Sequence, residues 1–109
     1  MIWKAIMWLW RWRRERQIRA FYKSWTWKRL RYKTGQKYGW RCMACGNSGY
    51  GAEIRIDHIE PIRLNWGRRL DPTNLQVLCN DCNMGKGSWD QTDFRPRSSI
   101  PKRILRCFT

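Results

Sequence analysis

The first forty residues of the chain carry apolar positions at helical spacing. Residues 1–20 open with a tryptophan-rich apolar run and continue into a densely basic one. Steps of three and four residues place Ile2, Ile6 and Leu9, together with Trp10, near one helical face. The pattern predicts a basic amphipathic helix. Its apolar face either packs on the rest of the chain or lies on a membrane surface or on DNA.

A second helical pattern covers residues 21–38. Ser24 is a candidate N-cap, and Gly39 stands where a helix commonly ends. The positions that recur at steps of three and four form one face toward a core: Trp27, Leu30, Thr34 and Tyr38. Basic residues point mostly elsewhere and suit phosphate contacts, among them Lys28, Arg29 and Lys33. The alternative is an ordinary solvated helix face.

Alternation of apolar and polar residues predicts strands in the second half of the chain. Residues 53–59 alternate as a strand does, and Pro61 ends the pattern because proline cannot donate to a sheet. Residues 62–73 read as a loop, and 75–78 as a second short strand. A short helix should follow, and the chain from Ser88 onward reads as irregular. Helices beside a small sheet place the chain in the α+β class.

The composition indicates the size of the core and the class of molecule that the chain binds. The chain has 109 residues, so a single domain with a modest core is expected, and Trp27, Trp40 and Leu78 are its simplest core candidates. Lys and Arg number 23 against 8 acidic residues, which gives a net charge of +15. Such an excess favours a polyanionic partner, nucleic acid above all, over a merely soluble charged surface.

The chain contains five cysteines, and four of them form two Cys-x-x-Cys pairs. The apolar run at the N-terminus lacks the flanks of a signal peptide and is shorter than the roughly 20 residues of a membrane span. Without a signal for secretion, the spacing of the two Cys-x-x-Cys pairs indicates metal binding in a reducing compartment rather than disulfides. Four thiolates suit a tetrahedral structural zinc ion, and the candidate ligands are Cys42, Cys45, Cys79 and Cys82. Cys107 is left over as a bystander thiol.

Residues between and beside these pairs suit phosphodiester hydrolysis. His58, the only histidine, has the ordinary pKa of a base that works near neutral pH. Asp57 and Asn83 offer oxygen ligands to a hard cation, and Asn74 could orient the imidazole. Each also has a plainer reading, as a core histidine, a cap or a turn residue. Because neighbours in a strand face opposite ways, Asp57 and His58 share a site only if the strand ends or bulges there.

These residues form a recognisable series. Asp57-His58-Ile59-x-Pro61 is followed by Asn74-Leu75-Gln76-Val77-Leu78-Cys79-x-x-Cys82-Asn83-x-x-Lys86. The series resembles the HNH endonuclease family in its zinc-braced form, and the resemblance extends over residues 21–93. The last position of the motif is Asn83, so the chain is a His-Asn-Asn variant. Asparagine there still supplies an oxygen ligand and favours Mg²⁺ or Mn²⁺ over softer metals.

The resemblance implies a ββα-metal fold braced by zinc on the four paired cysteines and preceded by basic helices. It implies His58 as the general base, Asp57 and Asn83 as ligands of one catalytic ion, and Asn74 as the residue that holds the His58 loop. DNA would be the substrate, cut to leave a 5′-phosphate and a 3′-hydroxyl. Lys86 is a further candidate for phosphate contact.

The resemblance also sets the wider expectations. One site cuts one strand, so a monomer should nick, and double-strand cleavage would need a homodimer or successive nicks. A phage packaging partner, and the cytoplasm of a bacterial or phage-infected cell, would fit the family, with no small-molecule substrate and no membrane partner. We divide the chain into a basic segment 1–20, a nuclease domain 21–93 and an irregular tail 94–109.

Two other functions fit parts of the sequence. A zinc-ribbon module that binds DNA without cutting it would share the zinc site and the charge. A membrane-active segment fused to a zinc domain would account for residues 1–12. A start of translation at Met7 or later would remove most of that segment from consideration.

Overall fold

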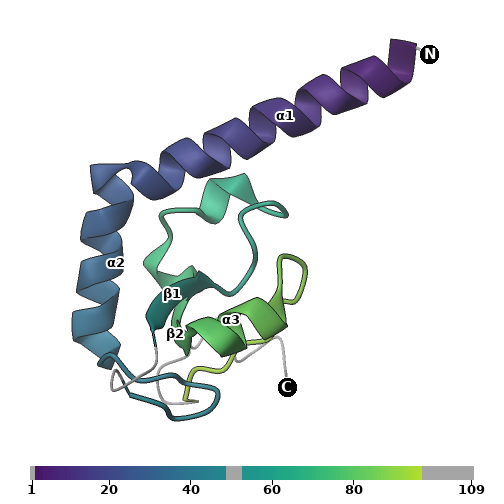
Figure 1. Ribbon diagram of the computed structural model, residues 1–109. Coiled ribbons are helices and arrows are strands. Elements are labelled where there is room, and N and C mark those ends of the chain that lie inside the picture. Colours follow the sequence, from purple (N-terminus) through teal and green to yellow (C-terminus); the bar gives the residue numbers. More distant parts are fainter. Residues whose placement is uncertain (1, 49–52, 97–109) are drawn as a thin grey trace.

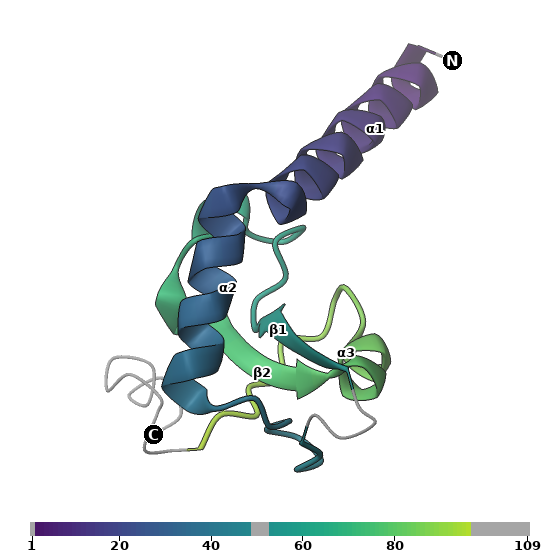
Figure 2. The same cartoon turned by 60° about the vertical axis from the view of Figure 1, so that its left-hand side comes forward.

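The computed structural model describes residues 2–48 and 53–96. Three helices surround a two-stranded sheet: α1 (Ile2–Lys23), α2 (Trp25–Tyr38), β1 (Ile54–His58), β2 (Leu75–Cys79) and α3 (Asn80–Lys86). Two short 3-10 turns, Trp66–Arg68 and Pro72–Asn74, lie in the connection between the strands. In Figures 1 and 2, α2 runs beside the sheet, and α3 packs at the end of β2. This arrangement matches the predicted α+β class.

The chain breaks between α1 and α2 at Ser24. Its backbone is extended (φ −70°, ψ 147°), and its hydroxyl oxygen accepts a hydrogen bond from the Trp27 backbone N–H at 3.2 Å. The predicted cap is therefore confirmed, as is the end of α2 at Gly39. The predicted helix over 21–38 was wrong at its start, because residues 21–23 belong to α1. The capping hydroxyl fixes that break.

The two strands are antiparallel, with Asp57 opposite Gln76 and His58 opposite Leu75. Every residue of β2 is buried. The strand predicted over residues 53–59 is β1, which ends at His58, and this end meets the condition under which Asp57 and His58 can share a site. The second cysteine pair leads directly into α3, as the sequence predicted.

The core gathers where α1, α2 and the sheet meet. Its buried apolar side chains are Ile18, Phe21, Trp27, Ile56, Ile62, Leu75 and Val77. Leu78 is fully buried in an adjoining cluster with Cys42 and Cys79, so Trp27 and Leu78 are confirmed as core residues. Trp40 was wrongly assigned to the core. Trp40 is 42% exposed, and its indole lies against α2 at Gly35.

The N-terminal half of α1 extends away from the rest of the fold (Figures 1 and 2). Ile2, Ile6, Leu9 and Trp10, which form the predicted apolar face, are all exposed, so this face does not pack on the body of the protein. Only Ile18 and Phe21 of α1 are buried. No described helix combines the length and the apolar character that crossing a membrane requires. The division of the chain at residue 20 stays a prediction, and that position lies inside α1.

Replacing Gly35 by alanine is expected to destabilise the fold. A Cβ at this position would overlap the six-membered ring of the Trp40 indole, which must then move. Overpacking of this kind costs about 1–3 kcal/mol in the free energy of unfolding. Gly85→Ala is the matched control, because the space around Gly85 is open and alanine is favoured over glycine in a helix by up to about 1 kcal/mol. In thermal melts followed by circular dichroism, the melting temperature should fall for Gly35→Ala and not for Gly85→Ala. A Gly35→Ala protein with the melting temperature of wild type would contradict the prediction.

Candidate active site

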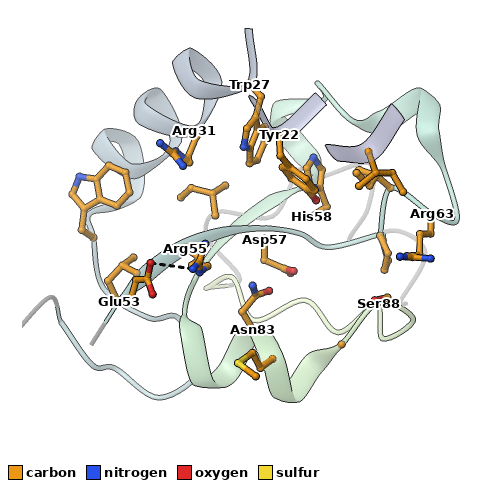
Figure 3. Close-up of a pocket in the computed structure, with 18 residues that line it drawn as sticks. Tyr22, Trp27, Arg31, Glu53, Arg55, Asp57, His58, Arg63, Asn83 and Ser88 are labelled. Carbon is orange, nitrogen blue, oxygen red and sulfur yellow. Dashed lines mark hydrogen bonds and ion pairs between the residues drawn. The ribbon is translucent and has the colours of Figure 1, made fainter. Parts of the chain in front are cut away.

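A cavity of about 940 Å³ opens at the end of β1, between α2, α3 and the loop after the strand. Asp57 and His58 both line it, together with Asn83 of α3 and Tyr22 and Trp27 of the helices. In the close-up of Figure 3, Asn83 points toward Asp57, and Tyr22 lies beside His58. The end of β1 thus brings three of the predicted site residues to one cavity.

His58 is held with its two ring nitrogens in different surroundings. Nε2 lies 2.8 Å from the carbonyl oxygen of Arg69 and, since a carbonyl only accepts, Nε2 must carry the proton. Nδ1 is then unprotonated and available as a base. Burial lowers the pKa of His58, against the opposing effect of the Arg69 carbonyl. The imidazole is therefore neutral near pH 7.

Aromatic rings fix the orientation of the imidazole. Trp27 stacks on it with ring centroids 4.8 Å apart and planes inclined by 23°. Phe21 and Tyr22 approach its other sides at centroid distances of 5.9 and 6.1 Å. The sequence identified Trp27 only as a core residue and gave Tyr22 no role. Tyr22 at the end of α1 and Trp27 at the start of α2 lie on either side of the break at Ser24, and both contact His58.

Asn74 is completely buried and spans the loop that follows His58. Its side-chain oxygen accepts from the Glu60 backbone N–H at 2.8 Å, and its amide donates to the Glu60 carbonyl at 3.0 Å. Its own carbonyl accepts from the Ile59 N–H at 2.8 Å. These bonds tie the chain just after His58 to the start of β2. The contacts are those that the proposed holding role requires.

Asp57 lies in a partly neutralised environment. Its Oδ2 accepts from Gln76 Nε2 at 2.9 Å and lies 3.2 Å from the ammonium of Lys86. Burial raises the pKa of Asp57, while Gln76 and Lys86 act in the opposite direction. Gln76 also donates to the Thr92 carbonyl and accepts from the Phe94 N–H, so it links β1, β2 and the chain after α3. The sequence analysis did not single out Gln76, because the residues around a glutamine in a strand do not show that it will form hydrogen bonds with distant segments.

Lys86 is buried where α3 meets the end of β1. Its side chain is 1% exposed, and its ammonium contacts Asp57 and donates to the carbonyls of His58 and Ile59. In this position the ammonium joins α3 to the end of β1, and a contact of Lys86 with phosphate stays a prediction. A helix-borne lysine is ordinarily solvated, so only the packing of α3 on the sheet reveals the pairing.

Asn83 is half-buried on α3, and within residues 2–48 and 53–96 its side chain forms no hydrogen bond. Its amide oxygen and the Asp57 carboxylate face the same cavity (Figure 3). A carboxylate beside an unpaired amide oxygen fits the oxygen-ligand preference of Mg²⁺ or Mn²⁺. The donor set therefore suits a hard divalent cation, with Lys86 already balancing part of the Asp57 charge.

The four paired cysteines form a second cluster. Their sulfur atoms, of Cys42, Cys45, Cys79 and Cys82, all lie within 4.8 Å of one another. Cys45 and Cys79 are 3.7 Å apart between sulfurs, close to the edge of about 3.8 Å that Zn–S bonds of 2.3 Å give a tetrahedron. The backbone N–H of Cys45 and of Cys82 each lie 3.4 Å from the sulfur three residues earlier. This geometry can hold a metal ion, and Cys107 lies outside the described residues.

The thiols of this cluster influence one another. Burial disfavours the Cys42 thiolate, but backbone N–H groups outweigh it and lower the pKa of Cys42 to about 6. Hydrogen bonds with the neighbouring thiols, that of Cys79 first, raise the pKa of Cys82 to about 12. Several thiolates so close together repel one another, and a bound cation would stabilise their negative charge.

The predicted DNA contacts lie on α2, outside the cavity. Arg29 and Lys33 are exposed and line a shallow groove with Leu70, and the Lys28 ammonium lies 4.9 Å from the centre of the Trp25 ring. Three arginines that the sequence did not single out line the cavity itself: Arg31, Arg55 and Arg63. Arg55 pairs with Glu53, and Arg63 pairs with Glu15 of α1. Cationic side chains thus flank the acidic and imidazole groups.

Replacing Lys86 by methionine is expected to lower stability by about 3 kcal/mol, because it leaves the Asp57 carboxylate buried without its partner. Chemical denaturation measures this loss. Lys33→Met is the matched control, since Lys33 is exposed on α2 and should affect only DNA affinity and its salt dependence. If Lys86→Met were as stable as wild type but bound DNA more weakly, the result would support a contact between Lys86 and phosphate instead of a role in stability.

Comparisons with known proteins identify relatives of this chain. A family model described as HNH endonuclease matches residues 42–88. A probable HNH endonuclease of Lactococcus phage SK1 is 30% identical over 73 residues, which cover 63% of this chain and 77% of that protein. The crystal structure of the deep-sea thermophilic bacteriophage GVE2 HNH endonuclease with manganese ion is similar at a TM-score of 0.60 and 35% identity. That match covers 68% of this chain and 82% of the other.

Proposed function

Because this chain belongs to the HNH endonuclease family, we propose that it hydrolyses DNA phosphodiesters with His58 as general base and one divalent cation held by Asp57 and Asn83. Membership makes it a metal-dependent nuclease by class. The residue roles, the ions and the number of strands cut are the proposal.

The observation that carries the proposal is the orientation of His58. The Arg69 carbonyl oxygen accepts a hydrogen bond from Nε2–H and leaves Nδ1 as the basic nitrogen, in a cavity shared with Asp57 and Asn83. A general base must be unprotonated and within reach of the water that it activates. The neutral imidazole, braced by Trp27, meets the first condition near pH 7.

A divalent cation on Asp57 and Asn83 would neutralise negative charge developing on the phosphate and on the leaving oxygen. We propose Mg²⁺ or Mn²⁺, and the similar GVE2 enzyme was crystallised with manganese. Gln76 and Lys86 orient the Asp57 carboxylate. Asn74 keeps the segment after His58 in place through its bonds to Glu60.

We propose that the ion held by the four cysteines is structural zinc. Four sulfurs leave a tetrahedral ion no open position for substrate, as in closed structural sites. Cys42 precedes the sheet, and Cys79 and Cys82 bracket the start of α3, so such an ion would join distant parts of the chain. Its role would be to position α3, and with it Asn83, against β1.

The partner that fits the charge is DNA. The net charge of +15, and the arginines around the cavity, favour a phosphate backbone over a small molecule. One site acts on one strand, so we propose nicking, with a homodimer or successive nicks required for double-strand cuts. The phage relative is consistent with work in the cytoplasm of an infected bacterial cell, where a packaging partner would also be met.

The test is a supercoiled-plasmid assay with Mg²⁺ or Mn²⁺ and purified wild-type protein. Nicked circles that disappear with a chelator of divalent cations, while the zinc content stays constant, are the expected result. Binding and gel shift without any nicking, in the presence of either ion, would favour the non-catalytic DNA-binding module.

A further inference from the structure

Tyr22 places a hydroxyl beside the basic nitrogen of His58. Its phenolic oxygen lies 3.5 Å from Nδ1, the nitrogen that the Arg69 carbonyl leaves unprotonated. Tyr22 comes from the last turn of α1, a segment outside the HNH match at 42–88. Figure 3 shows the phenol and the imidazole together at one side of the cavity.

The distance allows one water molecule, placed to the side of the two groups, to contact both of them. A direct hydrogen bond from a hydroxyl to nitrogen is typically about 2.8 Å long, so 3.5 Å is a weak contact. A water placed about 2.8 Å from both atoms completes a triangle with ordinary hydrogen-bond lengths. Nδ1 would accept from this water, and the phenol would donate to it.

We propose that Tyr22 is a positioning residue for the attacking water, which its hydroxyl holds together with Nδ1 of His58. The inference rests on the proposed nuclease function and adds a group that the sequence motif does not contain. In the step, the water loses a proton to Nδ1 while its oxygen forms a bond to phosphorus. The bond from phosphorus to the leaving 3′ oxygen then breaks, and its electron pair goes to that oxygen, which takes a proton from solvent water to become the 3′-hydroxyl. The phenol keeps its proton throughout.

The surroundings of Tyr22 suit this role. Its ring makes edge contacts with Phe21 and Trp27, with centroids 5.3 and 5.6 Å away, so the hydroxyl is aimed by packing. Burial, and then the charge of Asp57, raise the pKa of Tyr22 to about 12. The group is therefore a phenol rather than a phenolate at working pH and can donate to water.

The kinetic test compares wild type with Tyr22→Phe, which keeps the ring and removes the hydroxyl. Loss of one hydrogen bond to the reacting water should lower kcat for nicking roughly 10-fold, while KM and the melting temperature stay within error. Tyr32→Phe is the matched control, because that tyrosine is exposed on α2 and does not line the cavity. An unchanged kcat for Tyr22→Phe would overturn the proposal, and so would a higher one, which would mean that the hydroxyl obstructs the base.

A second measurement does not depend on activity. His58 is the only histidine, so ¹⁵N labelling of histidine gives one pair of ring signals. The expected spectrum has Nε2 protonated and Nδ1 unprotonated, and Tyr22→Phe should shift Nδ1 far more than Nε2. A protonated Nδ1 in wild type, or an Nδ1 signal indifferent to Tyr22→Phe, would overturn the proposal.

The two measurements separate this inference from the function beneath it. If wild type nicks and His58→Ala does not, the nuclease assignment stands, and Tyr22→Phe alone decides the role of Tyr22. If wild type fails to nick with either ion, the proposed function fails, and the role of Tyr22 in holding an attacking water fails with it.

Discussion

Replacing His58 by alanine is expected to remove plasmid nicking while the protein stays folded. General-base catalysis contributes about 10²–10⁴-fold to rate, so the loss should fall in or beyond that range. His58 is the only histidine, and within the described residues its Nδ1 is the imidazole nitrogen free to take a proton from water. Supercoiled plasmid with Mg²⁺ or Mn²⁺, read as the rate of nicked-circle formation, measures the effect.

The controls for this variant separate chemistry from folding. Zinc content, far-ultraviolet circular dichroism and DNA affinity should all stay near wild type. His58→Gln fills more of the space beside Trp27 and should be as inactive as His58→Ala. Added imidazole should restore part of the rate to His58→Ala, since a small base can enter the space that the side chain left. Full nicking by either variant would remove His58 from the role of base.

Replacing Cys79 by serine is expected to abolish cooperative folding near room temperature. Structural zinc in small domains contributes about 10–16 kcal/mol in apparent binding free energy, as much as the whole stability of about 5–15 kcal/mol that a domain usually has. Cys79 caps α3 and belongs to the sulfur cluster, so its loss affects both the ion and the helix that carries Asn83. A thermal melt should show a broad, non-cooperative change and a zinc content well below one ion per chain.

Cys107→Ser is the matched control, because Cys107 lies outside both Cys-x-x-Cys pairs. It should melt and bind zinc as wild type does. Prolonged treatment with a strong zinc chelator should reproduce the Cys79→Ser result in the unaltered protein. A Cys79→Ser protein with the wild-type melting curve would show that the cluster does not hold the fold together.

The sequence predicted the parts of this fold that depend on local pattern. The spacing of Trp27, Leu30 and Thr34 gave α2 and its buried face, and alternation gave β1. The combined motif marked His58, Asp57 and Asn83, which the fold does bring to one cavity. The catalytic roles of these residues stay predictions until an activity is measured.

Features that depend on distant contacts escaped the sequence. Gln76 reaches Asp57, Thr92 and Phe94, and no local signal distinguishes it from any other strand glutamine. The burial of Lys86 follows from how α3 packs on β1. Trp40 was expected in the core, yet it is partly exposed, lies against α2 at Gly35 and lines the cavity. Each miss is a case in which tertiary packing decides what a side chain does.

The inner end of α1 holds Phe21 and Tyr22 against His58, whereas its outer half extends away from the rest of the fold. A continuous helix of 22 residues is about 33 Å long at 1.5 Å per residue. That length equals about ten base-pair steps of DNA at 3.4 Å each. A sequence-specific DNA-binding module fused ahead of Ile2 would therefore bind at a fixed distance from the cleaved phosphodiester. The length of α1 would set that distance.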